Sequence, residues 1–166
     1  MQTKALALAA ILLCAGSPFA SAQSAPDPAA FAATAASSNM FEIESSQLAL
    51  DEATNDDVKA FAQQMIDDHT AAGEKMKAAA QSDGVTPPAA MAAKDQTALE
   101  MLQAANAEAF DTAYLTAQVA AHDEAVALFK TFSENGEASA LKSFAAETLP
   151  TLEKHQAMAH ELAGKE

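Results

Sequence analysis

The sequence predicts an all-α protein, and three observations support this fold class. The chain is rich in alanine and has only 5 glycines and 6 prolines in 166 residues, a composition with high helix propensity. Apolar residues recur with the spacing of amphipathic helices along most of its length. Short signals of glycine, proline and asparagine divide this pattern into helix-length segments.

Residues 1–22 have the features of a cleaved secretory signal peptide. Lys4 supplies a positive charge, residues 5–15 form an apolar run too short to cross a bilayer, and Ala-Ser-Ala at 20–22 matches a cleavage site. A lipoprotein signal is the alternative, because Cys14 ends the apolar run, but Leu13 is not the small residue that this processing requires. We therefore expect cleavage after residue 22 and a periplasmic or secreted protein.

The remaining chain is predicted to be one acidic domain without disulfides. Residues 23–27 are expected to be a flexible N-terminus, and residues 28–166 a single helical-bundle domain. The only cysteine lies in the leader, and the net charge of −14 becomes about −15 once Lys4 is removed. The chain has no arginine and no basic run, which excludes nucleic acid and anionic membrane surfaces as expected partners. No later segment is expected to span a membrane, and the oligomeric state stays open.

Four long helices and one short helix are expected. Asn55, Gly84 and Gly136 mark breaks in the pattern, and Pro150 is expected to kink the last helix. The predicted ranges are about 28–53, 56–82, 90–105, 108–134 and 138–163. Two short-looped hairpins joined by one long crossover form the connection pattern of a ferritin-like four-helix bundle, here with a short extra helix in the crossover.

Each long helix places one titratable residue on its apolar face. On helical wheels these residues are Glu42, His69, His122 and His155. A buried carboxylate needs a partner, and a buried imidazole needs its nitrogens satisfied. Three neutral imidazoles and one carboxylate suit a transition metal such as zinc, iron or copper, and suit calcium poorly.

The heights of these residues along the helices agree only in part. Glu42 and His69 are each about a dozen residues from the first hairpin turn, so they are expected to be level. His155 is nearer eighteen residues from the start of its helix, whereas His122 is about a dozen from the end of the preceding one. For straight helices this places His155 about 8 Å away from the level of His122, an offset that a kink at Pro150 would reduce.

Plainer interpretations of the same residues stay open. A histidine on an apolar helix face is more often a satisfied core residue than a metal ligand. Glu42 can instead bond a histidine, Ser38 or Ser45. The acidic pair at 67–68 is most simply part of a solvated face.

With these residues in view, the sequence resembles the exported bacterial domain-of-unknown-function 4142 family. The segments that carry the resemblance are NMFEIESSQLAL (39–50), VKAFAQQMIDDHTAAGEKM (58–76), FDTAYLTAQVAAHDEAVALF (110–129) and LKSFAAETLPTLEKHQAMAHEL (141–162). The resemblance implies a ferritin-like fold and a periplasmic or secreted location. It implies no activity, and the outer-membrane label that such proteins often carry gains no support from this sequence.

The chain departs from the ferritin-like di-iron enzymes, which use Glu-x-x-His motifs on two helices. Ile66, Val119 and Leu152 stand three residues before the three inward histidines, so di-iron oxidation is not expected. No cysteine nucleophile, phosphate loop or serine triad motif is present in residues 23–166. Three hypotheses follow: a metal-binding envelope protein, a structural or partner-binding module without metal, and, ranked last, a mononuclear metalloenzyme.

Overall fold

The computed structural model describes residues 27–165, and within this range every regular element is a helix. The helices are α1 (Pro28–Glu52), α2 (Asp56–Ser82), α3 (Ala93–Gln103), α4 (Phe110–Asn135) and α5 (Ala140–Ala163). This confirms the all-α prediction, with α3 shorter than expected and α4 and α5 each beginning two residues later. The predicted signal peptide and residues 23–26 lie outside the described residues.

The helix ends follow from local side-chain chemistry. Asp27 and Asn55 cap α1 and α2 by accepting hydrogen bonds from backbone N–H groups two residues ahead, at 2.9 Å in both cases. Ser139 caps α5 in the same way, accepting from the N–H of Lys142 at 3.2 Å. At the end of α2, Gly84 adopts the left-handed conformation with a φ of 69°, which glycine adopts without steric cost.

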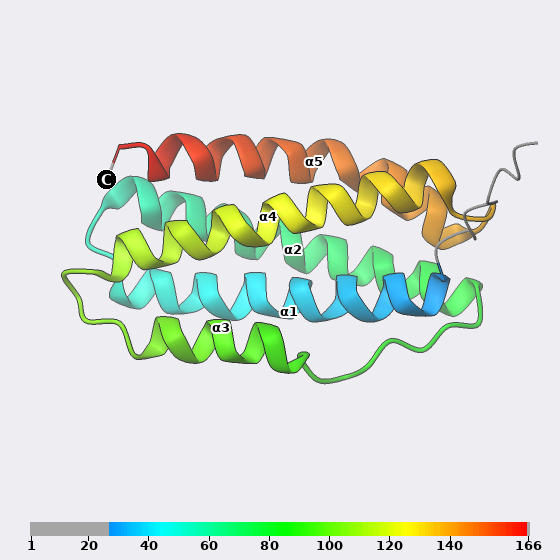
Figure 1. Cartoon of the computed structure of the whole chain (residues 1–166), viewed down its shortest axis with the longest axis horizontal. Helices are drawn as coiled ribbons and strands as arrows, with labels where there is room; N and C mark the ends of the chain where they lie inside the picture. Colours follow the sequence, from blue (N-terminus) through cyan, green and yellow to red (C-terminus); the bar gives the residue numbers. More distant parts are fainter. Residues whose placement is uncertain (1–26, 166) are drawn as a thin grey trace, which may run out of the picture.

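The four long helices run side by side around a shared interior. α1 packs against α2 and α4, and α5 packs against α2 and α4, so each long helix has two long neighbours. Figure 1 shows α2 and α4 running in the same direction, because the connection between them returns along the whole length of the molecule. This connection carries α3, which lies against α1 and contacts α4 more weakly.

Two carboxylates connect the two hairpins at opposite ends of the molecule. Asp111, in the first turn of α4, accepts hydrogen bonds from the backbone N–H groups of Thr54 and Asn55 in the α1–α2 turn, at 3.0–3.2 Å. Asp83, at the end of α2, accepts from the N–H groups of Ala140 and Leu141 at the start of α5, at 3.0 and 2.8 Å. Each hairpin therefore supplies a carboxylate that accepts hydrogen bonds from backbone N–H groups in the turn of the other.

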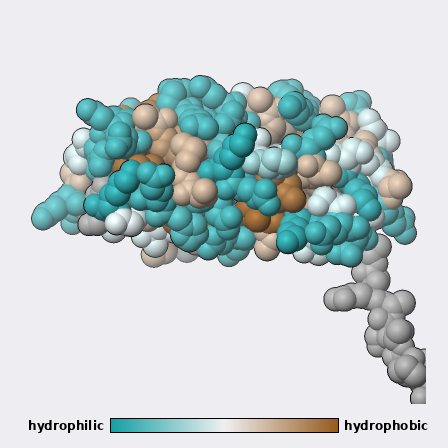
Figure 2. Space-filling view, turned by 90° about the horizontal axis from the view of Figure 1, so that it is seen from above, coloured by the Kyte–Doolittle hydropathy of each residue, from teal (hydrophilic) through white to brown (hydrophobic). Residues whose placement is uncertain are grey.

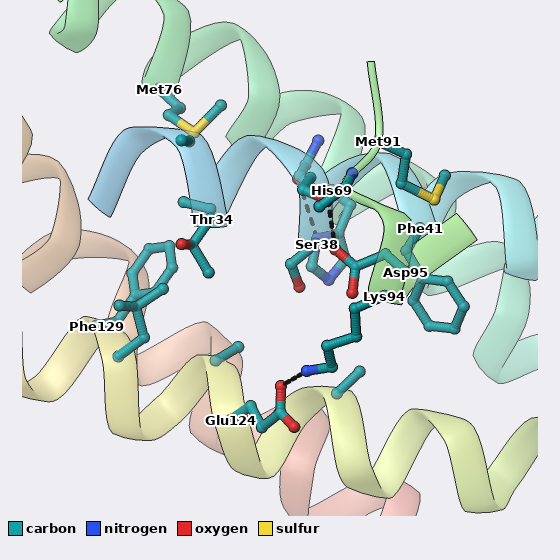
Figure 3. Close-up of a pocket in the computed structure, with 18 of the residues that line it drawn as sticks. Thr34, Ser38, Phe41, His69, Met76, Met91, Lys94, Asp95, Glu124 and Phe129 are labelled. Carbon is teal, nitrogen blue, oxygen red and sulfur yellow. Dashed lines mark hydrogen bonds and ion pairs between the residues drawn. The ribbon is translucent and has the colours of Figure 1, made fainter. Parts of the chain in front are cut away.

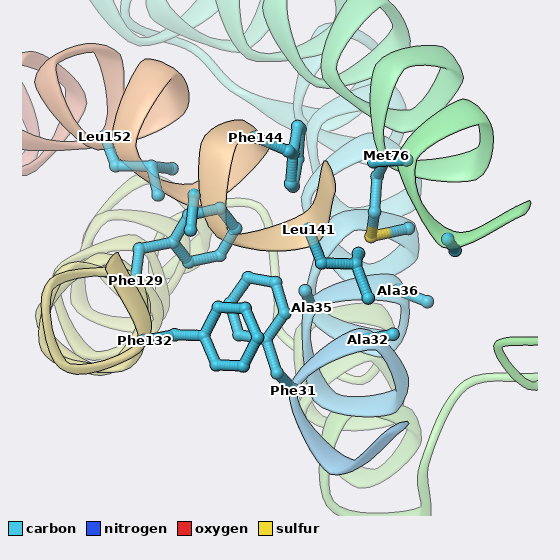
Figure 4. Close-up of a cluster of buried hydrophobic side chains, with 13 residues drawn as sticks. Phe31, Ala32, Ala35, Ala36, Met76, Phe129, Phe132, Leu141, Phe144 and Leu152 are labelled. Atoms are coloured by element: carbon cyan, nitrogen blue, oxygen red, sulfur yellow. The ribbon is translucent and has the colours of Figure 1, made fainter. Parts of the chain in front are cut away.

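Buried apolar residues form two separate clusters rather than one continuous core. The first contains a stack of Phe31 on Phe132, with ring centroids 4.0 Å apart, and Phe129 and Phe144 beside it (Figure 4). The second is built around residues such as Phe61, Tyr114 and Leu115. Buried polar residues of the four long helices belong to neither cluster, and they include all four of the predicted site residues: Glu42, His69, His122 and His155.

The face of the molecule shown in Figure 2 is predominantly hydrophilic. On the face shown in Figure 2, hydrophobic side chains appear only in small patches between hydrophilic ones. Among residues 27–165, no helix combines the length and the apolar character that a membrane span requires.

Candidate metal centre

Three histidines from three different helices meet in the interior. His69 of α2, His122 of α4 and His155 of α5 are 6 %, 1 % and 1 % exposed, and their ring centroids lie 5.5–5.8 Å apart. One nitrogen from each ring lies within 4.8 Å of the nitrogens of the other two. This cluster could hold a metal ion.

His155 lies level with the other two histidines, and the predicted offset of about 8 Å is wrong. The reason lies in the helix boundaries. α5 begins at Ala140, so His155 follows its start by fifteen residues, while His122 precedes the end of α4 at Asn135 by thirteen. A difference of two residues corresponds to only about 3 Å along a helix, and α5 continues through Pro150 without a break.

One nitrogen of each ring makes a hydrogen bond to an oxygen atom outside the cluster. Nδ1 of His69 bonds Oδ1 of Asn39 at 3.1 Å, and Nδ1 of His122 bonds the backbone oxygen of Gln118 at 3.0 Å. Nε2 of His155 bonds the carboxylate of Asp68 at 2.9 Å. A carbonyl or carboxylate oxygen only accepts hydrogen bonds, so each of these ring nitrogens must be the one that carries the proton.

The other nitrogen of each neutral ring therefore presents a lone pair. These nitrogens are Nε2 of His69, Nε2 of His122 and Nδ1 of His155, and all three are buried without a hydrogen-bond partner among residues 27–165. A buried acceptor without a partner is costly. Three imidazole lone pairs, each fixed by an oxygen on the opposite side of its ring, are the arrangement that metal-binding histidines show.

Burial also favours the neutral form of two of the rings, those of His69 and His155. Desolvation is the main cause that lowers the pKa of His69 to about 3, and the neighbouring His122 and His155 contribute the rest of this shift. Desolvation lowers the pKa of His155 too, although its hydrogen bond to Asp68 acts in the opposite direction. Neutral imidazole is the form that binds a metal ion.

Glu42 lies beside the cluster and not among the converging nitrogens. Its Oε1 is 3.7 Å from Nδ1 of His122, the nitrogen that also bonds the backbone oxygen of Gln118. The group of ligand-type atoms within 4.8 Å of one another, among the described residues, contains only the histidines. Burial raises the pKa of Glu42, against the lowering effect of His122 and Gln118. Glu42 is 1 % exposed, and such burial favours the neutral form of its carboxyl group.

Comparison with known proteins identifies the family. A family described as a domain of unknown function (DUF4142) matches residues 15–162. The chain belongs to this family. No curated protein and no solved structure matches the chain.

In this DUF4142 member, the side chains that orient His69 and His155 are not among the site residues predicted from the sequence. Asp68 was expected on a solvated face, but it reaches α5 and holds His155; the adjacent His69 points to a different side of the same helix. Asn39 lies one turn before Glu42 on α1, and a shared helix face was the only available signal for it. Gly73 of α2 leaves space for the side chain of Asn39, because a Cβ at this position would lie 3.0 Å from the Asn39 Nδ2.

Proposed function

We propose that this protein is an exported helical bundle that binds one transition-metal ion between His69, His122 and His155. The observation that carries the proposal is the direction of the three lone pairs. All three rings donate their proton outward, so the centre contains three acceptors and no donor. A water molecule has two protons and cannot satisfy three acceptors, whereas a divalent cation can accept all three lone pairs.

The donor set favours zinc, iron or copper over hard cations. Neutral imidazole suits these metals, whereas calcium and magnesium prefer oxygen ligands. A tetrahedral zinc ion with bonds of about 2.0–2.1 Å holds its ligand nitrogens roughly 3.4 Å apart. The nitrogens lie within 4.8 Å of one another, so loading would draw them closer by at most about 1.4 Å.

Glu42 has a supporting role in this proposal. Its carboxyl oxygen faces Nδ1 of His122, and a carboxylate behind a ligating imidazole raises the basicity of that ring. Metal binding places positive charge next to this group, which favours its ionised form over the neutral one that burial favours. Glu42 is not a direct ligand in this proposal, because the group of converging ligand atoms among the described residues contains only the three histidines.

The helix arrangement supports a ferritin-like assignment, which we also propose. α2 and α4 run in parallel because a long crossover joins them, while the helices within each hairpin are antiparallel (Figure 1). That connectivity distinguishes ferritin-like bundles from simple up-and-down bundles. The three histidines then occupy the bundle interior, the usual location of metal sites in such folds.

The structural-module alternative is less well supported. If the buried polar residues served only to fix helix register, their polar atoms would be expected to pair with one another. Instead five side-chain atoms of these residues have no partner among residues 27–165, including Oε2 of Glu42 and Oε1 of Gln118 as well as the three ring nitrogens. Export to the periplasm or beyond, inferred from residues 1–22, would place the site where envelope metals are available.

The test is metal content and uptake. The mature protein would be produced without a histidine tag, exported, and purified without chelator, and elemental analysis and native mass would be measured on the same sample. We expect one transition-metal ion per chain, or uptake of one equivalent of zinc by the metal-free protein with an increase in melting temperature.

Matched variants separate this site from adventitious binding. His69→Ala and His122→Ala should abolish stoichiometric uptake, while His160→Ala, which removes a histidine whose side chain is 54 % exposed, should leave it intact. Uptake that survives His69→Ala and His122→Ala, or a protein that ignores added zinc, iron and copper, would refute the proposed function.

A further inference from the structure

A large cavity opens beside the histidine cluster. Its volume is about 810 Å³, and its walls come from all four long helices and from the connection that carries α3. Figure 3 shows His69 near its middle, with Met76 and Phe129 towards one end and Phe41 and Met91 towards the other. The volume falls within the range of about 300–1,000 Å³ that is typical of small-molecule sites.

Small side chains create this cavity. Alanine is the commonest residue in its lining, from Ala33 and Ala35 on α1 to Ala121 and Ala125 on α4. Protein interiors are normally filled to the density of organic crystals, and leucine or phenylalanine at a few of these positions would close the space without disturbing the helix pattern. The larger lining residues, such as Phe129 and Leu152, are also apolar.

Two of the charged residues in the lining form an ion pair, and a third accepts a hydrogen bond from a hydroxyl group. Lys94 of α3 forms an ion pair with Glu124 of α4 across the cavity (Figure 3). Asp95 accepts a hydrogen bond from the hydroxyl of Ser37, which in turn accepts one from the N–H of Ala92 at 2.7 Å. An anionic ligand would have to displace Glu124 from Lys94 to gain a counter-charge, and the protein's net charge of −14 adds a further penalty. A cationic ligand would have to give up its hydration against walls that are mostly apolar.

We propose that this cavity binds a small, neutral, predominantly apolar molecule. The alanine-rich walls supply apolar contact, and the lining lysine, Lys94, is already paired with Glu124. The part of the ligand nearest His69 would lie next to the histidine cluster. Binding depends on the cavity alone and requires no metal, so this proposal stands or falls separately from the proposed function.

The first experiment titrates the metal-free protein with N-phenyl-1-naphthylamine, a neutral dye that fluoresces in apolar surroundings. We expect saturable binding of about one dye per chain, displaced by 1-octanol at concentrations at least tenfold lower than by octanoate or octylamine. The three competitors share one chain length and differ in head-group charge. Absence of saturable binding, or displacement by either ion as effective as by octanol, would overturn the proposal.

Cavity-filling variants localise the site. Ala125→Leu and Ala33→Leu extend side chains into the cavity from α4 and α1, and each should weaken dye binding by at least tenfold. Ala127→Leu makes the same change at an exposed position of α4 that does not line the cavity, and it should bind the dye as the wild-type protein does. Equal affinity in all three variants would place the dye elsewhere and refute the assignment.

A measurement on the unmodified protein does not depend on how the variants fold. Met76 and Met91 line the cavity, whereas Met101 is 71 % exposed and lies outside it. In methyl NMR spectra, octanol should shift the signals of Met76 and Met91 and leave that of Met101 in place. The opposite pattern would show binding to the outer surface.

Discussion

Acid should destabilise the metal-free protein before its carboxylates are protonated, and His69 supplies a calculable part of that loss. The pKa of this ring is lowered from 6.5 to about 3, first by burial and then by His122 and His155. The ring of His69 therefore takes up a proton near pH 6.5 in the unfolded chain but stays neutral at this pH in the folded protein. The contribution to stability is complete above that pH and declines as the pH falls towards 3.

Between pH 7 and pH 5 this one residue should cost about 2 kcal/mol of unfolding free energy. The lowered pKa of His155 acts in the same direction. The raised pKa of Glu42 acts in the opposite direction, because its folded state binds a proton more readily than the unfolded chain. The net loss in the wild-type protein therefore mixes several groups, and a comparison with a variant is needed to isolate His69.

The assay is urea unfolding of wild-type and His69→Asn protein at pH 7 and pH 5, with chelator present throughout. Glu42 is present in both proteins, so its contribution largely cancels. The stability difference between them should shrink by about 2 kcal/mol at the lower pH, with His160→Asn as a control for loss of a surface histidine. A difference that is the same at both pH values would show that the ring of His69 is not held neutral, and would refute the argument from burial.

Three further predictions concern groups around the site and the helix ends. A Gly→Ala change such as Gly73→Ala normally stabilises a helix by about 1 kcal/mol, but here the added methyl group displaces Asn39. We therefore expect the affinity for zinc to fall roughly tenfold, and an unchanged affinity in a calorimetric titration would contradict this. Glu42→Gln should raise the urea midpoint of the metal-free protein at pH 7.5, because burial opposes ionisation of the carboxyl group. This gain should diminish as the pH falls and the carboxyl group of the wild-type protein takes up a proton, and a gain independent of pH would count against the argument from burial. Asp111→Ala removes the carboxylate that accepts from the α1–α2 turn, so thermal unfolding should show a loss of about 1–3 kcal/mol, whereas Asp51→Ala at an exposed position of α1 should have little effect.

The helices could be predicted from the sequence because their signals are local. Asn55 bonds a backbone N–H group two residues ahead, and Gly84 ends its helix by its own backbone conformation. Helix propensity and amphipathic spacing likewise act over one or two turns. The inward direction of the three histidines follows from the same spacing. Their shared height did not follow, because each residue of error in the end of α4 or the start of α5 changes the relative height of His122 and His155 by about 1.5 Å, and these errors add.

The partners of the histidines were not predictable, because each contact except one joins two helices that are distant in the chain. Asp68 and His155 are 87 residues apart, and Asn39 and His69 are 30 apart. An aspartate beside an inward histidine looks solvent-facing on a wheel of its own helix, and only the position of α5 reveals its partner. The cavity was equally hidden, since alanine favours helix whether it faces a neighbour or an empty space.

The exchange of carboxylates between the hairpins has a consequence for how the chain reaches its native state. The α1–α2 turn is completed by Asp111 and the start of α5 by Asp83, so neither half of the sequence contains all the acceptors that its own backbone needs. Separate fragments covering residues 27–92 and 93–165 should each be poorly helical alone and recover helicity when mixed. The two halves are then one cooperative unit, and partial unfolding that releases either hairpin would expose backbone donors in both.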